Sequence, residues 1–272
     1  MTSGFLAKMR VANGHAVAVQ AALDTAFGRD KAIVQDIVKA SDDAVVLSGE
    51  FDGMPVIFKK FLTENAPRLV KAQKREVSYL ETHLGHGKFR VNPCLATLPD
   101  DGVVVLGSVP GERVSRILKT ADAPRRAKVL ALSGGWLAAC AALRHEVKPL
   151  DANRILASLD PLVRRPLERG DNDLISHMIT DLTQQTSVLH GLSAKRAIAH
   201  SDFAPVNLHC DDDTIYAIDI QRAHWFPLAR IAARFLVAKD FYYDHSAPRR
   251  FGLHADDLKA FDPCGDIATP DG

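Results

Sequence analysis

The sequence predicts an α+β protein with two lobes, a small β-rich N-terminal lobe over residues 1–106 and a larger α-helical lobe over residues 107–272. Two observations predict this division. Segments with strand-like alternation, separated by turn residues, occupy much of the stretch from 33 to 106, whereas helical patterns with Ala-rich faces fill residues 122–190. The chain has 272 residues, of which 47% are hydrophobic, and this is enough to bury a sizeable core.

The N-terminal lobe is expected to begin with a helix and to continue as a sheet. Apolar residues recur with helical spacing over residues 16–27, and Gly28 ends the pattern. A three-stranded antiparallel meander is then predicted, with strands over residues 33–40, 44–51 and 55–62. Its second turn is Asp52-Gly53, which is typical of tight turns because glycine accepts positive φ without steric cost.

A long helix is predicted next, over residues 66–84, and Gly85 ends it. Its basic cluster is expected to be a solvated face and consists of Arg68, Lys71, Lys74 and Arg75. The remaining elements are expected to be strands over residues 91–98 and 103–106, helices within 122–190, a hairpin that pairs 208–210 with 216–218, and a helix over 228–237.

Composition and charge exclude several classes of protein. Lys plus Arg (34) and Asp plus Glu (33) nearly cancel, so the broad basic surface of a nucleic-acid-binding protein is not expected. Residues 1–10 lack the pattern of a signal peptide, and no run approaches the roughly 18 apolar residues that span a bilayer. The cysteines have no C-x-x-C spacing. We therefore expect a cytoplasmic protein with reduced thiols and no integral membrane segment.

The segment from His200 to Asn207, together with Asp219 after a short apolar run, carries the chemistry. An aspartate, an asparagine five residues later and a second aspartate form a recurring phosphoryl-transfer arrangement. In that arrangement Asp202 takes or orients the proton of an attacking hydroxyl, and Asn207 and Asp219 hold Mg²⁺ against nucleotide phosphates. Phosphoryl transfer needs charge neutralisation and in-line positioning, which oxygen ligands around Mg²⁺ supply.

This segment resembles the catalytic loop of the aminoglycoside phosphotransferase and choline kinase-like family of the protein-kinase-like superfamily. That family reads H-G-D-x-x-x-x-N and then apolar-I-D, and this chain has Ser201 in place of the glycine. Ile220 and Gln221 follow Asp219 where protein kinases have Phe-Gly, which counts against a protein kinase. The resemblance implies a bilobal protein-kinase-like fold and an ATP- and Mg²⁺-dependent transfer of the γ-phosphate to a hydroxyl of a small molecule.

Two upstream residues resemble the family's phosphate-binding pair. The strand that ends in Lys59 resembles V-A-I-K, so Lys59 rather than Lys60 is expected to bind the α- and β-phosphates. The helix segment around Glu76 resembles R-E-x-x-x-L, whose glutamate pairs with the strand lysine. In helical phase Glu76 lies near the apolar stripe and Glu81 is turned away from it, and a carboxylate near an apolar face needs a partner.

Residues 103–112 resemble the family's hinge pattern, L-V-M-E-Y-(I/L/V)-P-G-E. The resemblance makes Leu106 the gatekeeper and turns the C=O of Gly107 and the N–H of Val109 toward the nucleotide base. The backbone makes these contacts, so side-chain identity is loosely constrained, and Gly107-Ser108 replaces the usual Glu-Tyr.

Departures from the family pattern keep other functions open. No Gly-rich loop covers the phosphates, so the turn at residues 41–43, which holds two aspartates, is expected to do so. The helix after Asp219 begins Leu228-Ala229-Arg230, without the aspartate that braces the catalytic loop in the family. These departures motivate a non-catalytic nucleotide-binding pseudokinase as an alternative. A saccharide or lipopolysaccharide-core kinase is another, because residues 219–223 look like the D-L-H-R-A of those enzymes.

Overall fold

The computed structural model describes residues 3–157, 172–240, 249–250 and 253–262. Its N-terminal lobe is built on a sheet with the strand order β1-β2-β3-β6-β5, in which every neighbouring pair is antiparallel. The elements of this lobe are α1 (Ser3–Phe27), β1 (Ala32–Ala40), β2 (Ala44–Phe51), β3 (Met54–Phe61), α2 (Ala66–Leu84), β5 (Cys94–Leu98) and β6 (Val103–Gly107).

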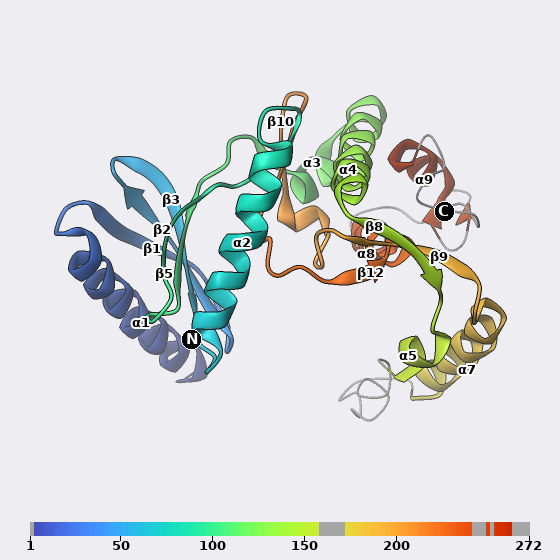
Figure 1. Cartoon of the computed structure of the whole chain (residues 1–272), viewed down its shortest axis with the longest axis horizontal. Coiled ribbons are helices and arrows are strands. Elements are labelled where there is room, and N and C mark those ends of the chain that lie inside the picture. The colour runs from blue at the N-terminus through green and yellow to red at the C-terminus, as the bar shows by residue number, and fades with distance from the viewer. Residues whose placement is uncertain (1–2, 158–171, 241–248, 251–252, 263–272) are drawn as a thin grey trace.

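Helices cover both faces of this sheet, with α1 on the outer face and α2 on the side of the C-terminal lobe (Figure 1). The strand β6 shows why both are needed. Val103 and Val105 pack in the cluster beneath α1, whereas Val104 and Leu106 pack in a second cluster with α2. Side chains alternate between the faces of a strand, so a strand that is apolar on both faces must be covered twice.

Two smaller sheets tie distant parts of the chain together. One has the order β4-β11-β10-β7 and joins the segments before and after β6 to the hairpin that follows residues 200–207. The other has the order β12-β9-β8. Their strands are β4 (Phe89–Val91), β7 (Glu112–Arg113), β8 (His145–Pro149), β9 (Ser193–Ile198), β10 (Leu208–Asp211), β11 (Thr214–Ala217) and β12 (Trp225–Pro227).

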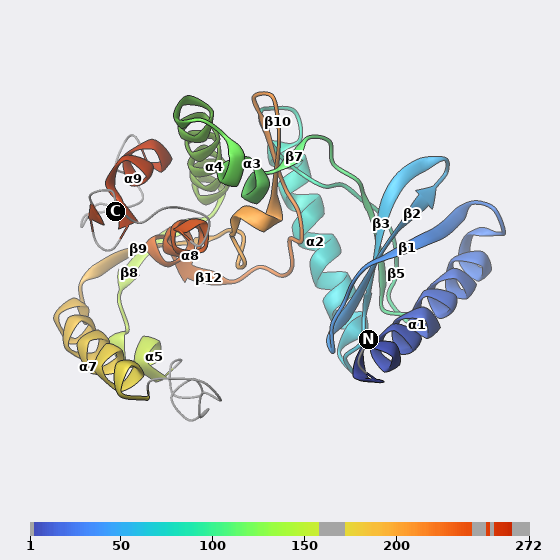
Figure 2. The ribbon, with the colours of Figure 1, turned by 180° about the vertical axis from the view of Figure 1, so that it is seen from behind.

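Helices make up most of the C-terminal lobe. They are α3 (Val114–Thr120), α4 (Ala123–Leu143), α5 (Ala152–Ala157), α7 (Asn172–Leu189), the 3₁₀ turn η1 (Pro205–Asn207), α8 (Leu228–Asp240) and α9 (Ala255–Phe261), with a two-residue ladder of β13 (Arg249–Arg250) and β14 (Leu253–His254). From behind, β8 and β9 are seen to lead away from α4 toward α5 and α7, which lie at the far end of the molecule (Figure 2).

The centre of the C-terminal lobe is α4. Its buried face carries Trp136 and Leu137, which belong to the largest apolar cluster described. At Gly134 the helix comes so close to α9 that a Cβ atom would overlap the carbonyl oxygen of Phe261. By length and composition α4 is also the one helix among the described residues that is apolar enough to cross a membrane, but half of that stretch is buried inside the protein.

The meander, the long helix, the hairpin after the catalytic loop and the helix from Leu228 are confirmed. The single strand predicted over 91–98 is wrong. It splits at Asn92-Pro93 because the Asn92 N–H donates to Ala217 in one sheet, while the Pro93 carbonyl accepts from Gly107 beside the other. The strands β8, β9 and β12 were not predicted, because their segments are only three to six residues long and lack a continuous apolar face.

Candidate active site

Hydrogen bonds connect the loop of Asp202 to the strand that leads into Asp219. The side chain of His200 is buried, and its Nε2 lies 2.8 Å from the carbonyl oxygen of Ile218, while the N–H of Asp202 donates to its Nδ1 at 3.2 Å. The N–H of Ile218 in turn donates to the carbonyl of Asn207 at 2.9 Å. These bonds hold the three predicted catalytic and metal-binding residues in one arrangement.

His200 supports the loop through its two hydrogen bonds, and burial sets its charge state. Burial lowers its pKa, and the bond to Ile218 and the nearby Asp219 and Asp202 only partly oppose this. The imidazole is therefore neutral near pH 7. Because its Nδ1 accepts from Asp202, its proton sits on Nε2 and is donated to Ile218.

Apolar packing fixes the loop from below. Phe203, which follows Asp202 directly, stacks on Trp136 with ring centroids 5.6 Å apart and an interplanar angle of 16°. The rings of Phe235 in α8 and Phe261 in α9 also pack against Phe203, with centroid distances of 5.2 and 6.5 Å. The backbone beside Asp202 is therefore anchored in the core by three other elements, as a preorganised site requires.

Asp202 has both carboxylate oxygens engaged. Oδ2 accepts from Nδ2 of Asn207 at 3.1 Å, and the same nitrogen also donates to the Asp202 carbonyl at 2.8 Å. Oδ1 accepts from Nε of Arg234 at 2.7 Å and also from Nη2. Burial raises the pKa of Asp202, but the bonds and charge of Arg234 and the bond from Asn207 outweigh it, so the net effect is a pKa below the ordinary value. The carboxylate is therefore ionised at neutral pH.

The side chain of Asn207 is oriented by these two bonds. They use its amide nitrogen, which leaves its carbonyl oxygen as the atom for a cation. Among the described residues no three His, Cys, Asp or Glu side chains gather into a metal site. A cation bound here would therefore take its remaining ligands from phosphate oxygens and water, as Mg²⁺ does at nucleotide sites.

Lys59 reaches across from the N-terminal lobe and pairs with Asp219. The side chain of Lys59 is 9% exposed and that of Asp219 is 34% exposed, so the carboxylate is more accessible to solvent than the ammonium group. Lys60 lies elsewhere and donates to the carbonyl of Asp101 at 2.8 Å. Asp219 has a positive φ of 58°, a conformation that non-glycine residues adopt at some cost and that is common at functional sites.

The expected pairing of Lys59 with Glu76 is not what the structure shows. Glu76 is buried, as its helical phase indicates, but it forms a two-pronged ion pair with Arg144, whose Nη1 lies 3.1 Å from Oε2. The planar guanidinium matches the carboxylate fork, which a lysine cannot do, and it also lies over the ring of Tyr79 at 4.1 Å. Glu76 therefore ties α2 to the end of α4.

A different residue of α2 contacts the loop of Asp219. The buried Gln73 donates from Nε2 to the carbonyl of Ile220 at 2.7 Å. Arg144, Gln73 and Arg234 were not predicted from the sequence. No motif marks the first two, and Arg234 lies on the exposed side of a helix whose apolar pattern was recognised without its contact to Asp202.

The expected hinge follows β6. The N–H of Gly107 donates to Pro93 at 2.8 Å and that of Ser108 to Pro55 at 3.1 Å, and neither bond uses the Gly107 C=O or the Val109 N–H. At Gly111, where φ is +80°, a Cβ atom would overlap the carbonyl of Cys210, so glycine is required for the connector to pass the hairpin.

The turn at residues 41–43 lies at the same end of the sheet as Lys59. In the strand register Ala44 faces Phe61 and Val46 faces Lys59, so the lysine is two residues from the end that carries the turn. The Ser41 hydroxyl closes the turn on itself, since Oγ lies 3.0 Å from the Ala44 carbonyl and accepts from the Ala44 N–H at 3.2 Å. Backbone bonds close the turn as well, since the Ser41 N–H donates to the Ala44 carbonyl at 2.9 Å and the Asp43 carbonyl accepts from the Leu62 N–H at 2.8 Å.

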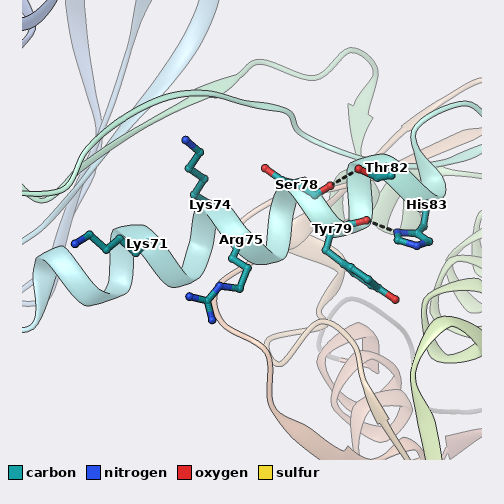
Figure 3. A pocket seen from close by; sticks show the side chains of 7 residues that line it. All are labelled: Lys71, Lys74, Arg75, Ser78, Tyr79, Thr82 and His83. Carbon is teal, nitrogen blue, oxygen red and sulfur yellow. Dashed lines mark hydrogen bonds between the residues drawn. The ribbon is translucent and has the colours of Figure 1, made fainter.

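The exposed side of α2 has a hollow of about 510 Å³ that none of the predicted site residues lines (Figure 3). Lys74 and Ser78 point to one side of the helix, and Arg75 and Tyr79 point to the other. The basic side chains are exposed, as expected of a solvated face. Because these side chains diverge, they do not form a converging binding site.

The fold and the arrangement of the loops are those of a two-lobed kinase-like protein, with a lysine of the sheet meeting the aspartates of the helical lobe. No protein-family model matches the sequence. No curated protein matches it either.

Solved structures do match, and they have the protein-kinase-like fold that the motif predicts. Aminoglycoside 2′-phosphotransferase-IIIa in complex with GDP gives a TM-score of 0.65 at 12% identity, over 93% of this chain and 85% of its own. A choline/ethanolamine kinase family protein from Mesorhizobium loti gives 0.61 at 10% identity, over 92% of this chain and 76% of its own. A choline kinase from Streptococcus pneumoniae gives 0.54 at 11% identity, over 90% and 85%. The chain thus has the bilobal α+β fold of the aminoglycoside phosphotransferase and choline kinase-like proteins.

Proposed function

We propose that the protein is an ATP- and Mg²⁺-dependent phosphotransferase that transfers the γ-phosphate to a hydroxyl of a small molecule. The observation that carries the proposal is the meeting of Lys59 with Asp219, beside a loop in which Asp202 and Asn207 are already hydrogen-bonded. A phosphoryl-transfer site needs these charges and oxygen ligands together, and here they come from both lobes.

Each residue has a role in the proposal. Asp202 takes the proton that the acceptor hydroxyl loses, as the acceptor oxygen bonds to the γ-phosphorus and the electron pair of the broken bond leaves with ADP. Asn207 and Asp219 hold Mg²⁺, which when bound neutralises phosphate charge. Lys59 then contacts the α- and β-phosphates. The Gly107 C=O and the Val109 N–H hold the base.

The proposal divides the chain into a nucleotide-binding lobe over residues 1–106 and a catalytic lobe over residues 107–272. Solved neighbours support a nucleotide ligand, since one is a complex with GDP and another, an aminoglycoside phosphotransferase, is a complex with AMP-PNP and hygromycin B at 15% identity and a TM-score of 0.58. We place the activity in the cytoplasm, which fits the free thiols of the three described cysteines.

Calorimetric titration of ATP with and without Mg²⁺ tests the nucleotide site. We expect the wild type to bind ATP in a Mg²⁺-dependent way and Asp219→Asn to lose that dependence, because the variant lacks a carboxylate ligand. Asp211→Asn, a change to an exposed aspartate at the end of β10, is the matched control and should bind like the wild type. A wild type that binds no ATP with Mg²⁺ would contradict the proposal.

A non-catalytic nucleotide-binding protein is the second candidate, and one observation favours it. Arg234 occupies the Asp202 oxygen that a base needs for the acceptor proton. ATP binding without phosphate transfer to a broad set of neutral, anionic and cationic hydroxyl compounds would favour this candidate. Transfer to any of them would exclude it.

A further inference from the structure

A cavity of about 500 Å³ adjoins the catalytic loop on the side of α8. Its wall includes Ser201 and Ala204 of the loop, Phe226 of β12, and Arg230, Arg234 and Val237 of α8. This volume lies within the range of small-molecule sites. Because Ser201 precedes Asp202 and Arg234 contacts it, a molecule in the cavity is beside the proposed base.

The polar side of this cavity is cationic. Arg230 and Arg234 are four residues apart on α8, so both guanidinium groups lie on one face of the helix, where like charges repel. No Asp or Glu is among the cavity's lining residues in the described part of the chain, and there Arg230 has no carboxylate within ion-pair distance. Arg230 lies instead over the ring of Phe226, at 5.2 Å.

The apolar side is formed by the aromatic ring of Phe226 and by aliphatic groups of α8, Ile231 and Val237 among them. Such a wall suits the carbon skeleton of a ligand, and the paired guanidinium groups suit an anion, which they can bind through forked hydrogen bonds. Arg234 is already paired with the Asp202 carboxylate, so a cationic ligand would meet mainly the charge of Arg230, which disfavours it.

We propose that this cavity is the acceptor site and that the acceptor is a hydroxyl compound that carries a carboxylate or a phosphate group, held by Arg230 and Arg234. The inference rests on the proposed function, because it assigns the acceptor of that reaction. It differs from what the structural neighbours' names suggest, since choline and aminoglycosides are cations at neutral pH.

The same contact gives Arg234 a positioning role. Without an acceptor, Arg234 holds Oδ1 of Asp202. An anion at Arg230 and Arg234 competes for that guanidinium, and each bond it takes leaves Oδ1 freer to accept the hydroxyl proton. Binding of the anionic group thus frees Asp202 to act as the base. A compound without an anionic group leaves Asp202 paired with Arg234.

A matched set of sugars tests the proposal by charge. Glucose is neutral, glucosamine is cationic, and glucuronate and glucose 6-phosphate are anionic at pH 7, on the same ring. Binding of each is measured by ligand-observed NMR titration, with Mg²⁺ and AMP-PNP present. We expect the anions to bind about tenfold or more tighter than glucosamine, with glucose between them. Whichever anion binds tighter identifies carboxylate or phosphate as the preferred group.

Arg230→Gln should remove most of this preference, whereas Arg68→Gln, which changes an exposed arginine on α2, should retain it. The inference is overturned if all the sugars bind equally, if glucosamine binds tighter than the anions, or if neither anion binds. It is also overturned if Arg230→Gln leaves the preference for anions unchanged. AMP-PNP is titrated separately. Nucleotide binding without an anion preference overturns this inference alone, whereas an anion preference without nucleotide binding overturns the proposed function.

Discussion

Asp202 is the residue on which the proposed chemistry depends, and its surroundings fix both its charge and its direction. Arg234 and Asn207 keep it ionised, while Phe203 anchors the adjoining backbone in the aromatic cluster. A general base must be unprotonated and rigidly placed before the hydroxyl arrives. The same bonds that satisfy these conditions also occupy its oxygens, so an acceptor has to displace one of them.

Asp202→Asn separates catalysis from nucleotide binding. The amide keeps the shape of the side chain but cannot take a proton, so we expect kcat to fall by about 10²- to 10⁴-fold. The ATP dissociation constant should stay close to that of the wild type, because Asp202 is not among the proposed phosphate or metal contacts. Steady-state kinetics and ATP titration check this, and normal turnover in the variant would remove Asp202 from the role of base.

Arg234→Gln should raise the pKa of Asp202. The arginine favours the ionised carboxylate through its charge and its hydrogen bonds, while burial acts in the opposite direction and remains in the variant. The pKa is measured by NMR titration of the aspartate carboxyl carbon. Arg230→Gln, which changes an arginine outside these bonds, should have a smaller effect. An unchanged pKa in Arg234→Gln would show that the pair contributes little in solution.

At the residue scale the sequence predicted what a motif encodes. The proximity of Asp202, Asn207 and the strand that leads into Asp219 follows from their spacing within one short segment, while their catalytic and metal-binding roles stay predictions. The partner of Glu76 was predicted wrongly. Burial of its carboxylate follows from helical phase, but the choice between Lys59 and Arg144 depends on how α2 and α4 meet, which no local pattern specifies. Arg234 was missed for the same reason.

At the scale of elements, α2 and α4 connect the two lobes through buried polar contacts. Gln73 of α2 holds the segment after Asp219, and Glu76 holds Arg144 at the end of α4. Polar contacts in a buried seam specify one alignment, because a shifted helix would leave a charge without its partner.

Glu76→Gln should lower the free energy of unfolding, because the arginine then loses its charged partner. Loss of one member of a buried pair costs about 3–5 kcal/mol, and the partial exposure of Arg144 reduces our expectation to about 2 kcal/mol. Urea unfolding measures this, with the exposed Glu81→Gln as the control, expected within about 0.5 kcal/mol of the wild type. A variant of normal stability with weakened ATP binding would instead support pairing with Lys59.

Gly134→Ala should destabilise the protein where α4 meets α9. The added methyl group overlaps the backbone of Phe261, so α9 has to move, and overpacking of this kind costs about 1–3 kcal/mol. Gly14→Ala in α1 is the matched control, because nothing lies within 4 Å of its added carbon. That change should stabilise by about 0.5–1 kcal/mol through helix propensity. Equal effects of the two changes on urea unfolding would contradict the close approach.

At the scale of the whole molecule, the two lobes were predictable and the small sheets that join them were not. Alternation predicted the meander and long apolar spacing predicted the helices, because both patterns are local. The sheet of β4, β11, β10 and β7 pairs residues near 90 and 112 with residues near 210. Each of its strands is short, so their pairing is decided by the assembled protein.

Binding of nucleotide between the lobes should stabilise the whole chain. At an ATP concentration 100 times the dissociation constant, with Mg²⁺, mass action adds about 2.7 kcal/mol to the free energy of unfolding. Urea unfolding with and without Mg²⁺-ATP measures the gain, and Asp219→Asn at the same ATP concentration should show less of it. A gain of equal size without Mg²⁺ would show that the metal is not part of the bound state.

The aromatic cluster under the catalytic loop has a consequence for how activity arises during synthesis. Phe203 rests on Trp136 and Phe235, and Phe261 of α9 closes the cluster against Phe235 at 5.1 Å. When synthesis has passed Asp202, Asn207 and Asp219, the growing chain still lacks Phe261, whose ring completes the aromatic cluster that supports them. A nascent chain arrested on the ribosome before α9 emerges should therefore bind nucleotide poorly, and nucleotide binding should appear only when α9 docks.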